Sequence, residues 1–245
     1  MDLAIAAIAE RLKTATSVVA LTGAGVSAES GIPTFRGPEG LWQHYKPEDL
    51  ATPQAFARDP KLVWEWYDWR RQKIAPASPN PAHEVLAQLE HIVPDFLLIT
   101  QNIDGLHGLA GSRRLIEMHG SIWQVRCLTE GTVYENREVP LNVLPPRCAC
   151  GSLVRPDVVW FGESLSLEDQ ARTFAATGST DVFLTIGTSA LVQPAASLPV
   201  VAKDRGAFVA EINPVPTPIT PFVDSYLQGA AGIILPKILS ILTKG

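Results

Sequence analysis

Five short clusters of glycine, amide, carboxylate, hydroxyl and imidazole residues recur along the chain, each directly after a run of apolar residues. They are Gly23-Ala24-Gly25, Gln101-Asn102-Ile103-Asp104-Gly105, His119-Gly120, Gly187-Thr188-Ser189 and Asn213-Pro214. Backbone N–H groups and side-chain amides of this kind bind phosphates, ribose hydroxyls and carboxamides. Turns favour Gly, Asn, Asp and Ser in any case, so one cluster alone can be purely structural. Five together indicate a ligand site.

The first cluster has the spacing of a nucleotide-binding turn. Residues 23–28, Gly-Ala-Gly-Val-Ser-Ala, fit the pattern G-x-G-x-x-G/A directly after an apolar strand. The acid that usually binds ribose should end a second strand about twenty residues later. Residues 35–42 have the composition of a loop instead. The pattern therefore indicates a dinucleotide that is bound differently from that of an ordinary dehydrogenase.

The elements that must position these clusters alternate along the chain. Apolar runs predict strands over 18–21, 96–100, 114–118, 182–186 and 208–212. Helical patterns cover residues 2–14 and about 82–91, 167–177, 193–205 and 231–243. This alternation predicts an α/β fold with a Rossmann-like doubly wound parallel sheet. Ligands bind such a sheet at the carboxyl ends of its strands, where all five clusters lie.

Two segments interrupt the alternation. Residues 38–80 are rich in Trp and Pro and helical in pattern, and residues 123–156 are polar, rich in turns and contain every cysteine. We expect one catalytic domain over 1–245 with a smaller module made of these two insertions, the second of them zinc-ribbon-like. The Rossmann-like part then comprises about 1–37, 81–122 and 157–245.

Composition excludes several classes of protein. The chain has 245 residues, 46% of them hydrophobic and 18% charged, with a net charge of −5. These values exclude a disordered chain and argue against nucleic acid as a partner. No apolar run reaches the roughly 18 residues of a membrane span, and the first residues lack a secretory pattern. Three cysteines favour a reducing compartment. We expect a cytoplasmic monomer with no membrane or nucleic-acid partner.

Residues 23–37, GAGVSAESGIPTFRG, resemble the signature of the sirtuins, which are NAD-dependent protein-lysine deacylases. Further matches follow in family order: TQNIDGLH at 100–107, His119-Gly120, VVWFGE at 158–163, Gly187-Thr188-Ser189 and Asn213-Pro214. Together they run from about residue 18 to residue 235. The resemblance implies that the acyl oxygen of an acylated lysine attacks the ribose carbon bearing nicotinamide. Nicotinamide is released, and the acyl group ends on ADP-ribose as 2′-O-acyl-ADP-ribose.

The resemblance also implies site residues. His119 is the expected base, since an imidazole with a pKa near 6.5 can accept a proton at neutral pH, and Asn102 and Asp104 complete the catalytic set. Phe35 and Arg36 belong to a loop over the cofactor. The residues expected to bind NAD are Gly23, Ala24, Gly25, Ser27, Phe35, Arg36, Trp42, Gln101, Asn102, Ile103, Asp104, Gly187, Thr188, Ser189, Asn213 and Ala231.

The acylated lysine is expected to be held by Val158, Phe161 and Gly162. Residues 158–163 and the segment after Ser189 correspond to strands that clamp a peptide through main-chain hydrogen bonds. Two alternatives stay open at this point. One is a mono-ADP-ribosyltransferase that uses the same cofactor, and the other is a non-enzymatic NAD-binding module.

Tyr67 and Arg70 lie within the segment WEWYDWRR at 64–71. Residues three apart share one face of a helix, and a guanidinium beside a phenol can recognise a carboxylate. The pair resembles that of class III sirtuins, which remove malonyl, succinyl and glutaryl groups. The alternative is a helix whose tryptophans merely pack while Arg70 is solvated.

The cysteines depart from the family pattern of two C-x-x-C pairs. The residue three after Cys127 is Glu130, and the second pair is shortened to Cys148-Ala149-Cys150. Three thiolates with a carboxylate or a water could hold a structural zinc ion. The alternative is a segment without metal that is held by packing alone. We do not expect the cysteines to act as nucleophiles.

Overall fold

Six parallel strands form the large sheet of the computed structural model, which describes residues 2–35, 40–41 and 46–244. They are β1 (Ser17–Thr22), β2 (Asp95–Thr100), β3 (Leu115–Glu117), β7 (Val182–Ile186), β8 (Phe208–Asn213) and β9 (Ser225–Gln228). The order β3-β2-β1-β7-β8-β9 is that of a Rossmann sheet, with the direction of winding reversed between β1 and β7. The predicted fold class is confirmed. The sequence analysis missed β9, a four-residue edge strand.

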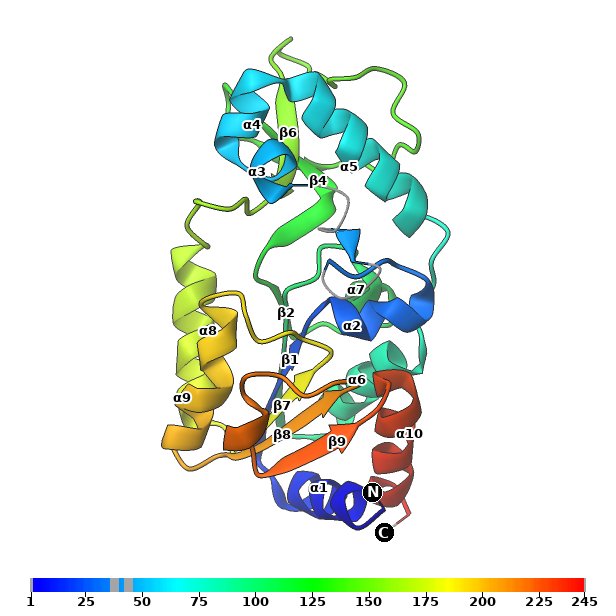
Figure 1. The fold of residues 1–245 in the computed structure, drawn as a ribbon, viewed down its shortest axis with the longest axis vertical. Coiled ribbons are helices and arrows are strands. Elements are labelled where there is room, and N and C mark those ends of the chain that lie inside the picture. Colours follow the sequence, from blue (N-terminus) through cyan, green and yellow to red (C-terminus); the bar gives the residue numbers. More distant parts are fainter. Residues whose placement is uncertain (1, 36–39, 42–45, 245) are drawn as a thin grey trace.

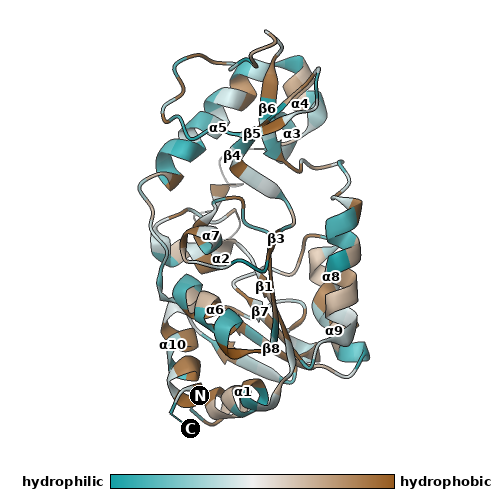
Figure 2. Ribbon diagram, turned by 180° about the vertical axis from the view of Figure 1, so that it is seen from behind, coloured by the Kyte–Doolittle hydropathy of each residue, from teal (hydrophilic) through white to brown (hydrophobic). Residues whose placement is uncertain are grey.

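Helices cover both faces of this sheet (Figure 1). On one face lie α1 (Asp2–Thr14), α6 (Pro81–Ile92) and α10 (Ala231–Leu242), and on the other lie α8 (Leu167–Ser179) and α9 (Leu198–Asp204). Val18 and Ala20 of β1 pack with the first group, and the alternate residues Val19 and Leu21 pack with the second. Because both faces are covered, the central strands β1 and β7 are largely apolar. Figure 2 shows this apolar character in the strands and in α10.

The helix predicted over 193–205 is wrong in its first part. The structure has a 3₁₀ turn, η3 (Ala195–Ser197), before α9 begins at Leu198. Pro194 and Pro199 both lack an N–H donor, which limits helical hydrogen bonding around them.

The smaller module contains three helices and a three-stranded antiparallel sheet in the order β5-β4-β6. Its elements are α3 (Pro47–Leu50), α4 (Pro53–Arg58), α5 (Pro60–Ile74), β4 (Gly120–Cys127), β5 (Val133–Glu135) and β6 (Val154–Val158). Helices α4 and α5 both begin with proline after a residue whose side chain accepts a backbone N–H, Thr52 and Asp59. Helix α5 and the three-stranded sheet share one hydrophobic core, in which Trp64 Nε1 donates to the carbonyl of Val154 at 2.8 Å.

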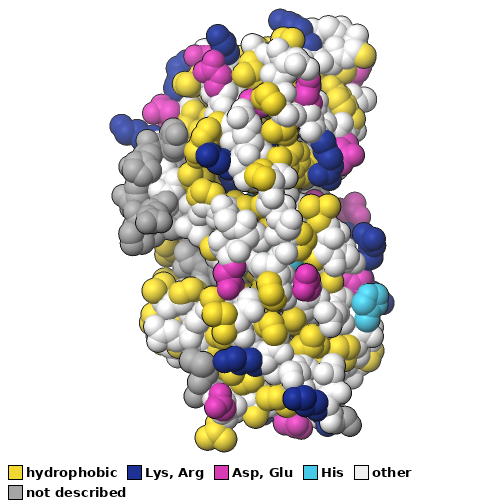
Figure 3. Space-filling view, turned by 90° about the vertical axis from the view of Figure 1, so that its right-hand side faces the viewer, with side chains coloured by type: hydrophobic (Ala, Val, Ile, Leu, Met, Phe, Trp, Pro, Cys, Tyr) yellow, Lys and Arg dark blue, Asp and Glu magenta, His cyan; other side chains and the backbone are white. Residues whose placement is uncertain are grey.

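Further short helical segments lie in the described part of the chain. They are α2 (Ala24–Ser27), η1 (Ala28–Ser30), α7 (Leu106–Leu109) and η4 (Thr220–Phe222). On the face drawn in Figure 3, acidic and basic side chains are interspersed and no large patch of one sign is seen. None of the helices in the described part of the chain is long and apolar enough to cross a membrane.

Candidate functional site

The turns after β1 and β7 meet directly at the point where the sheet winding reverses. Gly25 N donates to Gly187 O at 2.8 Å, and Gly23 N donates to Ile186 O at 3.1 Å. A Cβ atom on Gly25 would lie 2.7 Å from Gly187 O, and Gly187 itself has a φ of +60°. These glycines therefore let the two turns approach each other closely.

A buried network joins the first two clusters. Asn102 Nδ2 donates to Gly23 O and to Ser27 Oγ, both at 3.1 Å, and Ser27 Oγ donates to Asp104 Oδ2 at 2.8 Å. The other oxygen of Asp104 accepts the N–H of Leu106 at 2.9 Å. Burial raises the pKa of Asp104, and the hydrogen bonds from Leu106 and Ser27 oppose that shift. The network fixes both side chains at the strand end where the sequence predicts a catalytic set.

Two buried histidines, His83 and His107, lie beside the same network. His83 Nδ1 accepts the N–H of Asn80 at 3.2 Å, so its proton lies on Nε2, 3.4 Å from Ser27 Oγ. His107 Nε2 lies 2.9 Å from Thr22 Oγ1, and the two imidazole rings are 4.7 Å apart. Burial lowers the pKa of His83 to about 4 and that of His107 well below its usual value. Asn80 and His83 have the spacing of a capping box, in which the side chain three residues after the N-cap accepts the N-cap N–H. That spacing is the sequence signal that could have identified the contact of His83.

The burial of His83 predicts an acid-sensitive fold. Its pKa is about 6.5 when unfolded and about 4 when folded, so the unfolded state binds the extra proton as pH falls. The stabilisation is present above pH 6.5 and is lost as pH decreases towards 4, by roughly 3 kcal/mol. Glu117, whose pKa burial raises to about 7, acts in the opposite direction. The test is therefore the difference in unfolding free energy between wild type and His83→Gln, measured from pH 7 to pH 4.

That difference should shrink on acidification. The exposed His91 provides the control, because His91→Gln should leave the pH dependence of stability unchanged. A pH-independent difference for His83→Gln would contradict the prediction.

His119 follows β3 and is oriented by β2. Its Nδ1 lies 3.0 Å from Gln101 O, and since a carbonyl oxygen only accepts, Nδ1 carries the proton. Nε2 is then unprotonated and available to accept a proton. Burial lowers the pKa of His119, and the hydrogen bond to Gln101 opposes that shift, so the ring is neutral at pH 7. This arrangement is that of a general base.

The remaining strand ends continue along the same edge of the sheet. Gln101 Nε2 donates to Thr188 Oγ1 at 2.9 Å, which joins β2 to β7. Asn213 Nδ2 donates to Val215 O at 2.9 Å, and Asn213 O accepts the N–H of Gly229 at 3.1 Å. These contacts bring together the clusters after β1, β2, β3, β7 and β8, as the sequence predicts. Ala231 starts α10 just beyond them, and the predicted residues Arg36 and Trp42 lie outside the described part of the chain.

Tyr67 and Arg70 are both buried on α5, 3% and 5% exposed. The Arg70 guanidinium lies 4.5 Å from the ring centre of Phe35 and 5.3 Å from that of Trp66. Among the residues that the structure describes, no oxygen forms a hydrogen bond or ion pair with it. Burial raises the pKa of Tyr67 to about 12 and lowers that of Arg70 to about 10, so both are protonated at neutral pH. The alternative of a solvated Arg70 is wrong.

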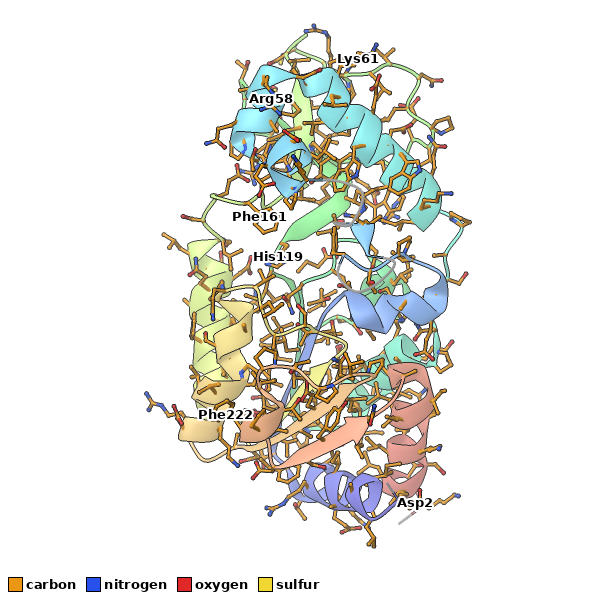
Figure 4. All side chains as sticks on the ribbon, viewed as in Figure 1. Asp2, Arg58, Lys61, His119, Phe161 and Phe222 are labelled. Atoms are coloured by element: carbon orange, nitrogen blue, oxygen red, sulfur yellow. The ribbon has the colours of Figure 1, made fainter. Side chains whose placement is uncertain are left out.

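The segments expected to clamp a peptide differ from the prediction. Strand β6 ends at Val158, and residues 159–163 leave it through a turn in which Gly162 has a φ of +87°. Glu163 Oε2 accepts the N–H of Trp160 at 2.8 Å and so holds the chain out of the strand. Ala190, with a φ of +53°, breaks extended structure after Ser189. Phe161 is half-exposed, and Figure 4 shows it with His119 between the small module and the large sheet.

The three cysteines lie together with Glu130. One ligand atom from each of Cys127, Glu130, Cys148 and Cys150 falls within 4.8 Å of all the others. The N–H of Glu130 lies 3.5 Å from Cys127 Sγ and lowers the pKa of that thiol, which favours the thiolate. Three thiolates and one carboxylate fit the four positions of a tetrahedral zinc site. Glu130, which stands where a C-x-x-C pair has its second cysteine, supplies a carboxylate at the fourth position of this cluster.

We expect the purified protein to bind about one zinc ion per chain through these four groups. Glu130→Ala should weaken zinc binding by about tenfold or more, and Glu130→Cys should strengthen it, because zinc prefers thiolate ligands. Metal analysis gives the stoichiometry, and competition with a chelator gives the affinity. Glu135→Ala, an exposed carboxylate in β5, is the control. A wild-type protein without zinc would contradict the assignment.

Comparison with known proteins agrees with this geometry. The sequence matches the Sir2 family over residues 23–194. An NAD-dependent protein deacylase of Aquifex aeolicus is 54% identical over 227 residues, which cover 92% of this chain and 95% of the relative. A mutant Sir2 homologue in complex with ADP-ribose superposes with a TM-score of 0.94 at 48% identity, covering 97% of this chain and 96% of the other. Sir2Af2 bound to a myristoylated histone peptide superposes with a TM-score of 0.81 at 35% identity, covering 100% and 98%. The chain therefore belongs to the Sir2 family.

Proposed function

We propose that this protein removes acyl groups from protein lysine side chains with NAD as co-substrate, and that it acts on succinyl- and malonyl-lysine faster than on acetyl-lysine. The observation that carries the acidic preference is the buried guanidinium of Arg70, which lies beside Tyr67 and forms no hydrogen bond or ion pair with an anionic group among the described residues. The carboxylate of Asp104 is near enough to raise the pKa of Arg70 against the effect of burial, but it does not pair with the guanidinium. The deacylase activity rests on the relatives that carry that name and on the strand-end geometry.

The strand ends offer a complete dinucleotide site. The backbone N–H groups of Ala24, Thr188 and Ser189 suit the phosphates, while Gln101 suits the distal ribose. Asn213 and Ala231 lie on the adenosine side. Phe35, half-buried against Arg70, excludes water from the reacting atoms. ADP-ribose and NAD in the complexes of similar proteins support this placement.

The chemistry requires an activated ribose and a base. NAD supplies the bond between ribose and nicotinamide, whose cleavage drives the transfer of the acyl group. Asn102 and Asp104, fixed by Ser27, hold the ribose and the carboxamide of nicotinamide. His119 Nε2 takes the proton of a ribose hydroxyl so that its oxygen can attack the acyl carbon. One water molecule is consumed overall, and the products are 2′-O-acyl-ADP-ribose, free lysine and free nicotinamide.

The acyl pocket explains the preference through desolvation. A carboxylate in a dry pocket is costly unless it is paired and hydrogen-bonded. Arg70 supplies charge and two parallel donors, and Tyr67 supplies a hydroxyl. An acetyl group makes no such contacts and leaves both donors unused.

The substrate is a lysine within a protein, as the peptide complexes of similar proteins support. The turn at 159–163 and the segment after Ser189 offer backbone groups to an extended peptide. We propose that the protein acts as a cytoplasmic monomer without nucleic acid, where a reducing environment keeps its three free cysteines available. The whole chain then works as one catalytic domain, with the small module contributing the acyl pocket.

One experiment tests this function. The protein is incubated with NAD and matched acetyl-, malonyl-, succinyl- and glutaryl-lysine peptides, and kcat/KM is compared for each. Mass spectrometry should identify 2′-O-acyl-ADP-ribose. A protein that gains ADP-ribose would instead indicate a mono-ADP-ribosyltransferase, and the absence of nicotinamide release would indicate a non-enzymatic NAD-binding module.

A further inference from the structure

The hydroxyl of Tyr67 has a partner in the turn that follows β6. Trp160, in the turn after β6, donates its indole N–H to Tyr67 Oη at 2.9 Å across 93 positions of sequence. Both side chains are 3% exposed. This hydrogen bond therefore links the helix that carries the acyl pocket to the segment that runs past His119 and Phe161.

The indole of Trp160 is held in one orientation by several contacts. The Arg155 guanidinium stacks on its ring at 3.5 Å from the ring centre, and the Phe56 ring lies at 5.3 Å. Arg155 forms a two-pronged ion pair with Glu163, at 2.5 and 2.8 Å, and Glu163 in turn accepts the backbone N–H of Trp160. With the ring fixed, the direction of its N–H is fixed as well.

The direction of the indole N–H limits where the O–H of Tyr67 can point. The Tyr67 oxygen accepts the indole proton, so its own O–H cannot point towards Trp160 and must point elsewhere. Among the described residues no acceptor for this O–H is found. Its charged neighbours Arg70 and Arg155 are donors only, and the oxygens of Glu163 already accept from Arg155 and from the N–H of Trp160. The hydroxyl and the guanidinium are thus two adjacent donors without an acceptor, which is the pattern that a carboxylate completes.

We propose that Trp160 is a positioning residue for the acyl pocket, which directs the O–H of Tyr67 at the carboxylate of an acidic acyl-lysine. The proposal rests on the proposed acidic preference. It adds a residue that touches neither the acyl group nor NAD and acts through the hydroxyl of Tyr67. Without the indole N–H of Trp160, the hydroxyl of Tyr67 can rotate about its C–O bond. Its proton is then no longer directed at the substrate.

Trp160→Phe tests this with little change of shape, because the ring can still stack on Arg155 and Phe56. We expect KM for a succinyl-lysine peptide to rise and kcat/KM to fall by about tenfold, the size of one oriented hydrogen bond to a charged group. The values for the acetyl-lysine peptide should stay within about twofold. In the Tyr67→Phe background, which has no hydroxyl to orient, Trp160→Phe should have no further effect on succinyl activity.

Trp64→Phe is the matched control. It removes an indole N–H from the same core, where Trp64 donates to Val154 O. This variant should lower the unfolding free energy yet leave the ratio of succinyl to acetyl activity unchanged. A purely structural role for Trp160 would make the two variants behave alike.

The outcomes separate this inference from the function on which it rests. If wild type shows no acidic preference, both fail. If wild type prefers succinyl-lysine and Arg70→Met removes that preference, the function stands. The role of Trp160 is then overturned when Trp160→Phe leaves the ratio unchanged, lowers both activities equally, or retains its effect in the Tyr67→Phe background.

Discussion

Replacing Arg70 by methionine is expected to lower kcat/KM for a succinyl-lysine peptide by about 2–5 kcal/mol in transition-state free energy, roughly 30- to 4,000-fold. Activity on the matched acetyl-lysine peptide should change by less than about threefold. Steady-state kinetics on the two peptides measure both effects. The ratio of the two values is the quantity that tests the role of Arg70.

The size of the effect follows from what the variant leaves behind. Methionine fills a similar volume against Phe35 and Trp66 and retains the apolar wall. It supplies no donor, so the carboxylate of the substrate would enter a dry pocket with only the Tyr67 hydroxyl to bind it. Leaving one member of a buried pair unpaired costs more than the pair itself contributes.

A charge change elsewhere on the same helix provides the control. Lys61 lies exposed in the first turn of α5 and pairs with Glu65. Lys61→Met removes one positive charge, as Arg70→Met does, and should leave the succinyl-to-acetyl ratio unchanged. Equal loss of both activities in Arg70→Met would show that Arg70 supports the fold and not the choice of acyl group.

The sequence predicts the large sheet well because its strands are buried on both faces. Residues 18–21 are all apolar, residues 182–186 are apolar except for Thr185, and both strands lie between helices on either side, so a simple apolar run locates them. Strand β9 includes Ser225, Tyr226 and Gln228, lies at the edge of the sheet and has no such run. In β4, Trp123, Val125 and Cys127 are buried while Gln124 and Arg126 are exposed. That alternation was visible, but the polar surroundings favoured an interpretation as turns.

In the candidate site, too, some features could be predicted from the sequence and others could not. The strand-end clusters could be predicted since the carboxyl ends of parallel strands meet at one edge whatever the loops do. The contacts of His83 with Ser27 and of Trp160 with Tyr67 could not. They join segments that are 56 and 93 positions apart, and they depend on which side chains the packing buries. Burial also sets the pKa values of His83 and His119, and no local pattern reveals it.

His119→Ala is expected to lower the rate of 2′-O-acyl-ADP-ribose formation by about 10²- to 10⁴-fold for succinyl- and acetyl-lysine peptides alike, because it removes the general base. The effect should be equal for both, in contrast to that of Arg70→Met, since the proton transfer occurs at the ribose and not at the acyl group.

The pH profile identifies the base. The pKa of His119 is lowered by burial, so wild-type kcat should rise with pH through a value below 6.5 and stay flat between pH 7 and 8. The residual activity of His119→Ala should lack that rise, whereas the exposed His91→Ala should keep it. A His119→Ala variant that forms 2′-O-acyl-ADP-ribose at the wild-type rate would contradict the role of His119. In that case the neutral imidazole held by Gln101 would be a structural feature of the turn, and the proton would have to leave through another group.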